Sequence, residues 1–168
     1  MKSLVPSDQP TAAVVAVASA ALAPGALALN LEQAQAFATP LLGTQTLDSG
    51  ENALAHAHGM AAILREMGGD EALQACPYLV YASEHLQRAS ETLARAFGED
   101  HARLAQSVTQ LNRLQRQARA SANDYGAAGA RNRSENIRRM LLAFSRDLRV
   151  VLVRLASRLQ TLRHHALT

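Results

Sequence analysis

Aromatic residues and cysteine are scarce in this sequence. Aromatic side chains make up 4% of the residues, and Cys76 is the single cysteine. One cysteine excludes an internal disulfide framework, so nothing indicates an oxidising compartment and the cytoplasm is the expected location. Because no base lies beside it, Cys76 is expected to be an ordinary buried thiol.

Strand-like alternation, internal repeats and long apolar runs are also missing. The apolar run at residues 12–22 is shorter than the roughly 20 residues that span a bilayer, so no membrane association is expected. We expect a frayed arm or a short docking helix there rather than a cleaved signal peptide. Hydrophobic residues make up 48% of the 168 residues, and the prominence of alanine and leucine among them favours helix. The sequence therefore predicts one all-α domain that is large enough to bury a core.

Proline and glycine divide the chain into segments. Residues 1–28 are expected to be a flexible Ala/Pro-rich leader, and residues 29–168 the folded domain. Helices are expected at residues 30–43, 51–67, 70–96, 99–118 and 134–165. The small and polar stretch 121–133 is expected to be a loop, with Ser134 as the N-cap of the last helix.

The last helix has the clearest apolar period. Its apolar residues recur at steps of three and four and predict one buried stripe: Ile137, Leu141, Phe144, Leu148, Val151, Leu155, Leu159 and Leu162. Arginines cover the other surfaces, while the net charge of the chain is only +3. This pattern is typical of a solvated face, in which arginine stems cover apolar surface. An RNA-backbone contact is the alternative, although the aromatics of a single-strand stacking platform are missing.

The segments 134–143 and 147–156, SENIRRMLLA and DLRVVLVRLA, resemble the hydrolase domain of the RelA/SpoT family. The resemblance extends back to about residue 42. It implies an all-α, HD-domain-like helical bundle. In that family the domain removes the 3′-pyrophosphate of (p)ppGpp with a metal, normally manganese. The ligands are a first His, an adjacent His-Asp pair and a later Asp.

Matched to this pattern, the sequence keeps one ligand position of four. The first His falls on His56, the His-Asp pair on Val80 and Tyr81, and the last Asp on Ser157. Manganese prefers imidazole and carboxylate ligands, so this set predicts no metal and no cofactor. Tyr81 is expected to fill the volume of the metal, and His56 to stay buried and hydrogen-bonded. Pro77 is expected to disturb the helix just before Val80.

The nucleotide pocket that the resemblance implies is altered as well. Ser49-Gly50-Glu51 survives, but Leu47 replaces a basic residue, Ala53 an aromatic one, and Thr161 an Asn that reads the base. An acidic pair that assists hydrolysis in the family corresponds to Glu84 and His85. With His56 or His58 these two residues could form a substitute carboxylate–imidazole site. The simpler interpretation is that Glu84 and His85 are surface residues.

The resemblance leads to a functional hypothesis. We interpret the chain as a catalytically inactive HD-type domain with a structural or regulatory role in a (p)ppGpp synthetase, a GTP pyrophosphokinase of the stringent response. Its partners would be the synthetase and regulatory domains of the same parent chain, and the ribosome through the parent protein. Two alternatives stay open: a residual metal-dependent (p)ppGpp 3′-pyrophosphohydrolase, and a basic module that docks on RNA or the ribosome.

Overall fold

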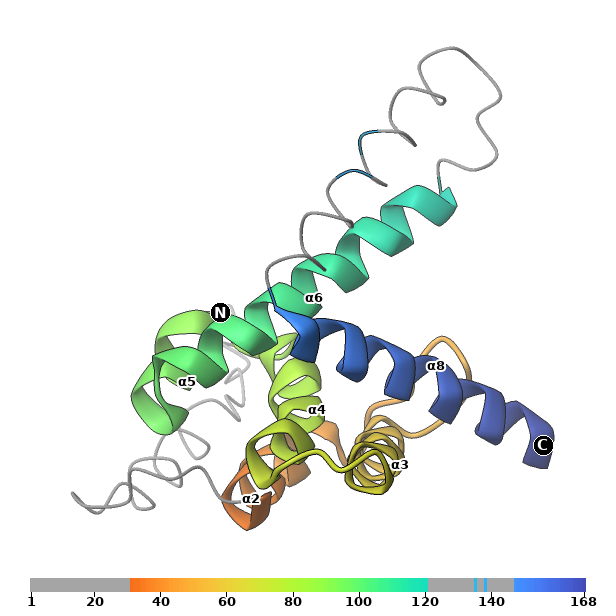
Figure 1. Ribbon diagram of the computed structural model, residues 1–168, viewed down its shortest axis with the longest axis horizontal. Helices are drawn as coiled ribbons and strands as arrows, with labels where there is room; N and C mark the ends of the chain where they lie inside the picture. Colours follow the sequence, from red (N-terminus) through yellow and green to blue (C-terminus); the bar gives the residue numbers. More distant parts are fainter. Residues whose placement is uncertain (1–30, 121–134, 136–137, 139–146) are drawn as a thin grey trace, which may run out of the picture.

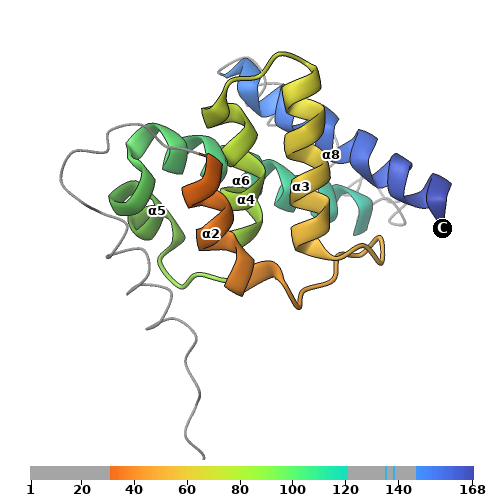
Figure 2. The same cartoon turned by 90° about the horizontal axis from the view of Figure 1, so that it is seen from below.

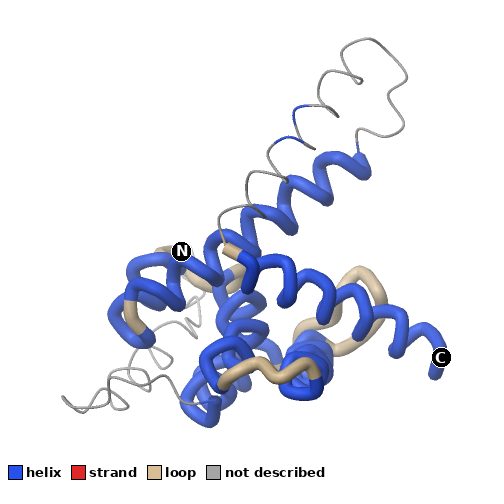
Figure 3. The backbone as a smooth tube through the Cα atoms, viewed as in Figure 1, coloured by secondary structure: helices blue, strands red, loops and turns tan. Residues whose placement is uncertain are grey.

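The computed structural model describes residues 31–120, 135, 138 and 147–168. Their regular secondary structure is helical, apart from an isolated bridge between Thr46 and Asn52. The helices are α2 (Leu31–Leu42), α3 (Ala53–Glu66), α4 (Glu71–Ser83), α5 (Ala89–Phe97), α6 (Glu99–Ala120) and α8 (Leu148–Leu167), shown in Figure 1 and Figure 3. The prediction of an all-α fold is confirmed. In the described part of the chain, no helix combines the length and apolar character that crossing a membrane requires.

Helix α4 lies at the centre of the bundle. It contacts α2, α3, α5, α6 and α8, and Figure 2 shows α2 and α3 beside it. Its side chains Tyr78, Leu79 and Val80 are almost completely buried, and Cys76 is buried as expected. Helix α8 packs across α3 and also touches α6. This arrangement brings one face each of α3, α4, α6 and α8 around a common cavity.

The single helix expected over residues 70–96 is wrong, because the chain turns after Ser83. The backbone N–H groups of Glu84, His85 and Leu86 each bond to the carbonyl three residues earlier, which tightens and ends α4. Helix α5 then starts at Ala89 and packs against α6. Since the turn contains neither glycine nor proline, the sequence carried no signal for it.

The single helix expected over residues 134–165 is also wrong, because Asp147 is extended, with φ −151° and ψ 110°. Its carboxylate accepts a hydrogen bond from the backbone N–H of Arg149 and caps α8. The Arg149 guanidinium also binds Asp100, and it holds the pKa of both carboxyl groups below their usual range. Several predicted features lie outside the described residues: the leader 1–28, the loop 121–133, the N-cap Ser134, and the apolar residues Ile137, Leu141 and Phe144.

The predicted buried face of the last helix is wrong as well. Leu155 is 55% exposed and Leu162 is 65% exposed. The face that packs against the bundle carries the smaller side chains of Val150, Val153 and Ala156 instead. These small residues let α8 approach α3 closely, whereas leucines on that face would hold the two helices apart.

Candidate functional site

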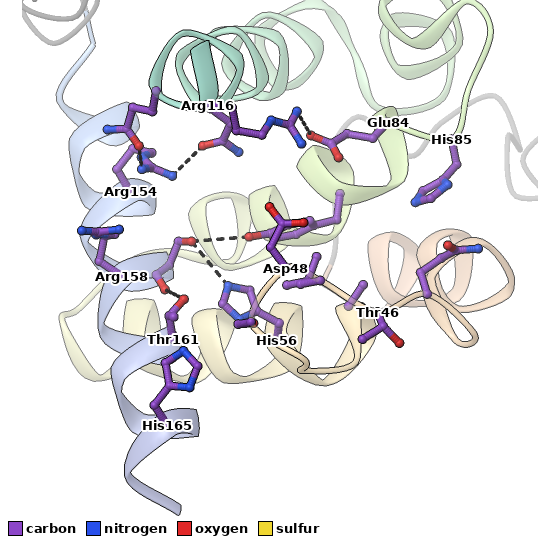
Figure 4. A pocket seen from close by; sticks show the side chains of 18 residues that line it. Thr46, Asp48, His56, Glu84, His85, Arg116, Arg154, Arg158, Thr161 and His165 are labelled. Atoms are coloured by element: carbon purple, nitrogen blue, oxygen red, sulfur yellow. Dashed lines mark hydrogen bonds and ion pairs between the residues drawn. The ribbon is translucent and has the colours of Figure 1, made fainter. Parts of the chain in front are cut away.

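Side chains from α3, from the central helix α4 and from α8 meet at one point. His56 of α3 places its Nε2 atom 3.4 Å from the Oγ of Ser157 on α8, and the Tyr81 hydroxyl of α4 lies 3.4 Å from the same oxygen. The rings of His56 and Tyr81 pack edge to face with centroids 5.4 Å apart. All three residues line a cavity, and Figure 4 shows His56 in its wall. The fold thus brings together three of the four positions at which the resemblance implies metal ligands.

The fourth position, Val80, lies in the hydrophobic core and is 1% exposed. It precedes Tyr81 on α4, which continues through Pro77 without a break. The expected disturbance at Pro77 is therefore wrong. A buried proline costs the helix one backbone hydrogen bond, and packing on several sides of α4 offsets that loss. Burial raises the pKa of the Tyr81 phenol, so its hydroxyl keeps its proton at neutral pH.

Glu51 holds the His56 ring and the Gln160 side chain in place. Its carboxylate is buried and lies 2.6 Å from His56 Nδ1, while its other oxygen accepts a hydrogen bond of 2.6 Å from the Gln160 amide. The Nδ1–H group donates to the Glu51 carboxylate, and this bond orients the ring so that Nε2 faces Ser157. The expected burial and hydrogen bonding of His56 are confirmed. Sequence reasoning did not assign a role to Glu51 or Gln160, although the surviving Ser49-Gly50-Glu51 was a signal for the first.

The loop before α3 fixes the position of Glu51. The Leu47 N–H donates to the Glu51 carbonyl and the Gly50 N–H to the Leu47 carbonyl, in a turn where Gly50 has a φ of +81°. Asn52 then caps α3 by accepting hydrogen bonds from the N–H groups of Leu54 and Ala55. The cap starts the helix directly after Glu51, so that His56 lies one turn beyond the carboxylate.

Gly59 makes room on α3 for the Gln160 side chain of α8. A Cβ atom at this position would lie 2.2 Å from the Gln160 side chain. We expect Gly59→Ala to push Gln160 away from Glu51 and to lower the free energy of unfolding by about 1–3 kcal/mol, measured by urea denaturation. In a Gln160→Ala background the clash is gone, and Gly59→Ala should be neutral or stabilising by up to about 1 kcal/mol, because alanine favours helix. Equal losses in both backgrounds would contradict this account.

A cavity of about 430 Å³ opens beside the three-helix contact. Three arginines line one side of it, namely Arg116 of α6 and Arg154 and Arg158 of α8, as Figure 4 shows. Arg154 donates to Asn112 at 2.6 Å and also to Gln115, so α6 and α8 are tied together across the cavity wall. The wall is cationic, although the motif positions alone did not indicate it.

The remaining predicted positions all line this cavity. They are Leu47 and Ala53 near the start of α3, Glu84 and His85 after α4, and Thr161 on α8. Thr161 donates its hydroxyl to the Ser157 carbonyl, and Glu84 forms an ion pair of 3.2 Å with Arg116. Glu84 is therefore engaged with α6 rather than with His56. Among the described residues, no three His, Cys, Asp or Glu side chains converge in a way that could hold a metal ion.

Comparison with known proteins identifies the family of the chain. An HD-domain family model matches residues 34–168. The chain is 35% identical over 127 residues to a probable guanosine-3′,5′-bis(diphosphate) 3′-pyrophosphohydrolase of Synechocystis, covering 76% of this chain and 15% of the relative. It is 32% identical over 133 residues to a GTP pyrophosphokinase rsh of Brucella ovis, covering 79% and 16%. With the bifunctional (p)ppGpp synthase/hydrolase SpoT of Escherichia coli it shares 29% over 134 residues, covering 80% and 18%.

Fold and family model together define an HD domain. The relatives specify the branch: the chain belongs to the HD domains of the RelA/SpoT family. It spans between 15% and 18% of the length of these relatives.

Proposed function

We propose that this chain is a catalytically inactive HD domain with a structural or regulatory role in a (p)ppGpp synthetase. One observation carries the proposal: where the resemblance places metal ligands, the Tyr81 hydroxyl, the Ser157 hydroxyl and His56 contact one another directly. The names of the relatives, which include GTP pyrophosphokinases, support the link to a synthetase.

The residues at the site do not fit manganese. Tyr81 and Ser157 offer neutral hydroxyls, and His56 offers one imidazole nitrogen. The Glu51 carboxylate binds Nδ1 of His56, on the side of the ring that faces away from Ser157. Manganese binding needs several imidazole or carboxylate ligands around one point. Without the metal, no group here would lower the pKa of a water to form the hydroxide that hydrolysis requires.

An inactive domain would act through packing. A domain whose surface contacts two conformations of a neighbouring domain unequally shifts the equilibrium between them. Helix α8 is suited to this role, because Glu51, Gly59 and the Arg154 contacts hold it against both α3 and α6. A rigid α8 would transmit the position of the bundle to an adjoining domain.

The two alternatives gain less support. A residual hydrolase would use Glu84, His85 and His56, but Glu84 binds Arg116. RNA docking would use the arginines of α8, but Arg149 binds Asp100 and Asp147, and Arg154 donates to Asn112. Arginines that are already paired contribute less to phosphate contacts.

We expect the purified chain to retain no stoichiometric manganese after dialysis, and its melting temperature to stay unchanged when manganese is added. A ligand that binds the folded state raises the melting temperature, so this measurement detects binding without any assumption about chemistry. A rise of several degrees at low metal concentration would overturn the proposal.

Turnover of ppGpp should be absent as well, and the triple change Val80→His, Tyr81→Asp and Ser157→Asp should not restore it. These changes supply metal ligands but leave Ala53 and Thr161 in the pocket. The measurement is release of pyrophosphate in the presence of manganese. Strong turnover by the triple variant would mean that the pocket still holds the nucleotide.

A further inference from the structure

The outward side of α8 carries a row of leucines, which we call the leucine stripe. Its members follow one another at alternating steps of four and three residues: Leu148, Leu152, Leu155, Leu159 and Leu162. This spacing places all of them on one helix face. Leu148 is 69% exposed, Leu159 is 40% exposed, and Leu152 is partly covered by the core.

The leucine stripe lies opposite the face of α8 that packs on the bundle. That inner face carries Val150, Val153 and Ala156, all buried. The larger apolar side chains therefore face away from the core, the reverse of an ordinary surface helix. A helix with two apolar faces usually packs against neighbours on both of them. A contiguous exposed apolar row marks an interaction surface.

The charges beside the leucine stripe select the kind of partner. Helix α8 contains no acidic residue, and Arg158 and Arg163 flank the stripe on its two edges. Arg158 is exposed and forms no ion pair with any residue in the described part of the chain. Arg163 pairs with Glu66 at 3.2 Å, but both side chains are about half exposed, and such a pair is weak and exchangeable. Carboxylates on the partner would complement both edges.

A second copy of this chain fits poorly. In a pair of helices that meet along such a stripe, the flanking residues face each other, so two copies would oppose arginine to arginine. A lipid surface fits poorly too, because α8 has no aromatic side chain to anchor it, and a four–three leucine spacing forms a narrow seam rather than a broad apolar face.

We propose that the leucine stripe docks an acidic amphipathic helix of a protein partner. Leucines of that helix at heptad spacing would pack on the stripe, and its glutamates or aspartates would face Arg158 and Arg163. The inference rests on the proposed function in one respect, that the domain acts by packing. It does not depend on the absence of hydrolysis or of metal. The domain could therefore be inactive without binding such a helix, and it could bind such a helix while still hydrolysing ppGpp.

The test uses the whole chain and a synthetic peptide of about four heptads, with leucine at the two core positions and glutamate at the flanking positions. Such a peptide repels itself and stays available for binding. We expect saturable binding in titration calorimetry that weakens with added salt. The double variant Leu155→Glu, Leu162→Glu should weaken it at least tenfold, and so should Arg158→Glu. Because these side chains are exposed, the melting temperature of each variant should stay close to that of the parent.

Control variants and control peptides distinguish an acidic helix from the other possible binding partners of the leucine stripe. Met67 is 51% exposed but lies at the end of α3, so Met67→Glu should leave binding unchanged. A peptide with lysine in place of glutamate should not bind. The proposal is overturned if the lysine peptide binds equally well, or if the acidic peptide does not bind. It is also overturned if sedimentation shows a dimer that the double leucine variant dissociates, or if α8 binds vesicles of anionic phospholipid through the same leucines.

Discussion

Glu51→Ala should lower the free energy of unfolding by about 3 kcal/mol, the largest loss expected from a single polar change at the site. The carboxylate is buried and binds both His56 Nδ1 and the Gln160 amide at 2.6 Å. Alanine would leave His56 Nδ1 and the Gln160 amide without this acceptor, and the His56 side chain is 1% exposed. Urea denaturation followed by circular dichroism measures the loss.

Two control variants separate the role of Glu51 from that of its neighbours. Glu51→Gln keeps an oxygen that can accept one of the two hydrogen bonds, so it should lose less than alanine. Ser157→Ala should be nearly silent, because the two contacts of Ser157 Oγ are 3.4 Å long and such contacts contribute little. If Ser157→Ala cost as much as Glu51→Ala, the stability of the site would reside in the three-helix contact rather than in the carboxylate.

Cys76 should be alkylated by iodoacetamide about a thousandfold more slowly in the folded chain than in urea, because only the thiolate reacts. Burial in the core raises the pKa of this thiol to about 12, and Asp147 adds to the shift while Arg149 opposes it. At pH 8 the folded protein therefore holds far less thiolate than an unfolded chain. The measurement is the rate of labelling by mass spectrometry. Comparable rates in the two states would show that α4 opens readily around Cys76.

The same thiol makes stability depend on alkaline pH. The unfolded chain releases the proton near pH 9 and the folded chain only near pH 12, so the folded state holds the extra proton between these values. Stability then falls as pH rises through this window, by about 1.4 kcal/mol per pH unit. Below pH 9 the contribution is constant. Cys76→Ala should remove the share that this thiol contributes, seen as a flatter plot of unfolding free energy against pH from pH 9 upward, where the buried Tyr81 phenol still adds its own dependence.

Much of the site was accessible from the sequence because short phrases preserve it. The residues after Asp147 place Ser157, and the spacing counted back from Met67 places His56. The structure brings these positions together with Tyr81. The partners that hold them could not be predicted, because Glu51 and Gln160 are far apart in the chain and meet only when α8 packs on α3, where Gly59 leaves room for the Gln160 side chain.

The sequence by itself determined that the chain is helical, since its alanine and leucine content and its three- and four-residue apolar steps favour no other structure. It also determined that α8 has an apolar row. Only the tertiary structure decided that Val150, Val153 and Ala156 face inward and the leucines outward. Periodicity shows that a helix has apolar faces, but the choice between two of them depends on the space that the neighbouring helices leave, and here the small side chains of α8 pack toward α3 and α4.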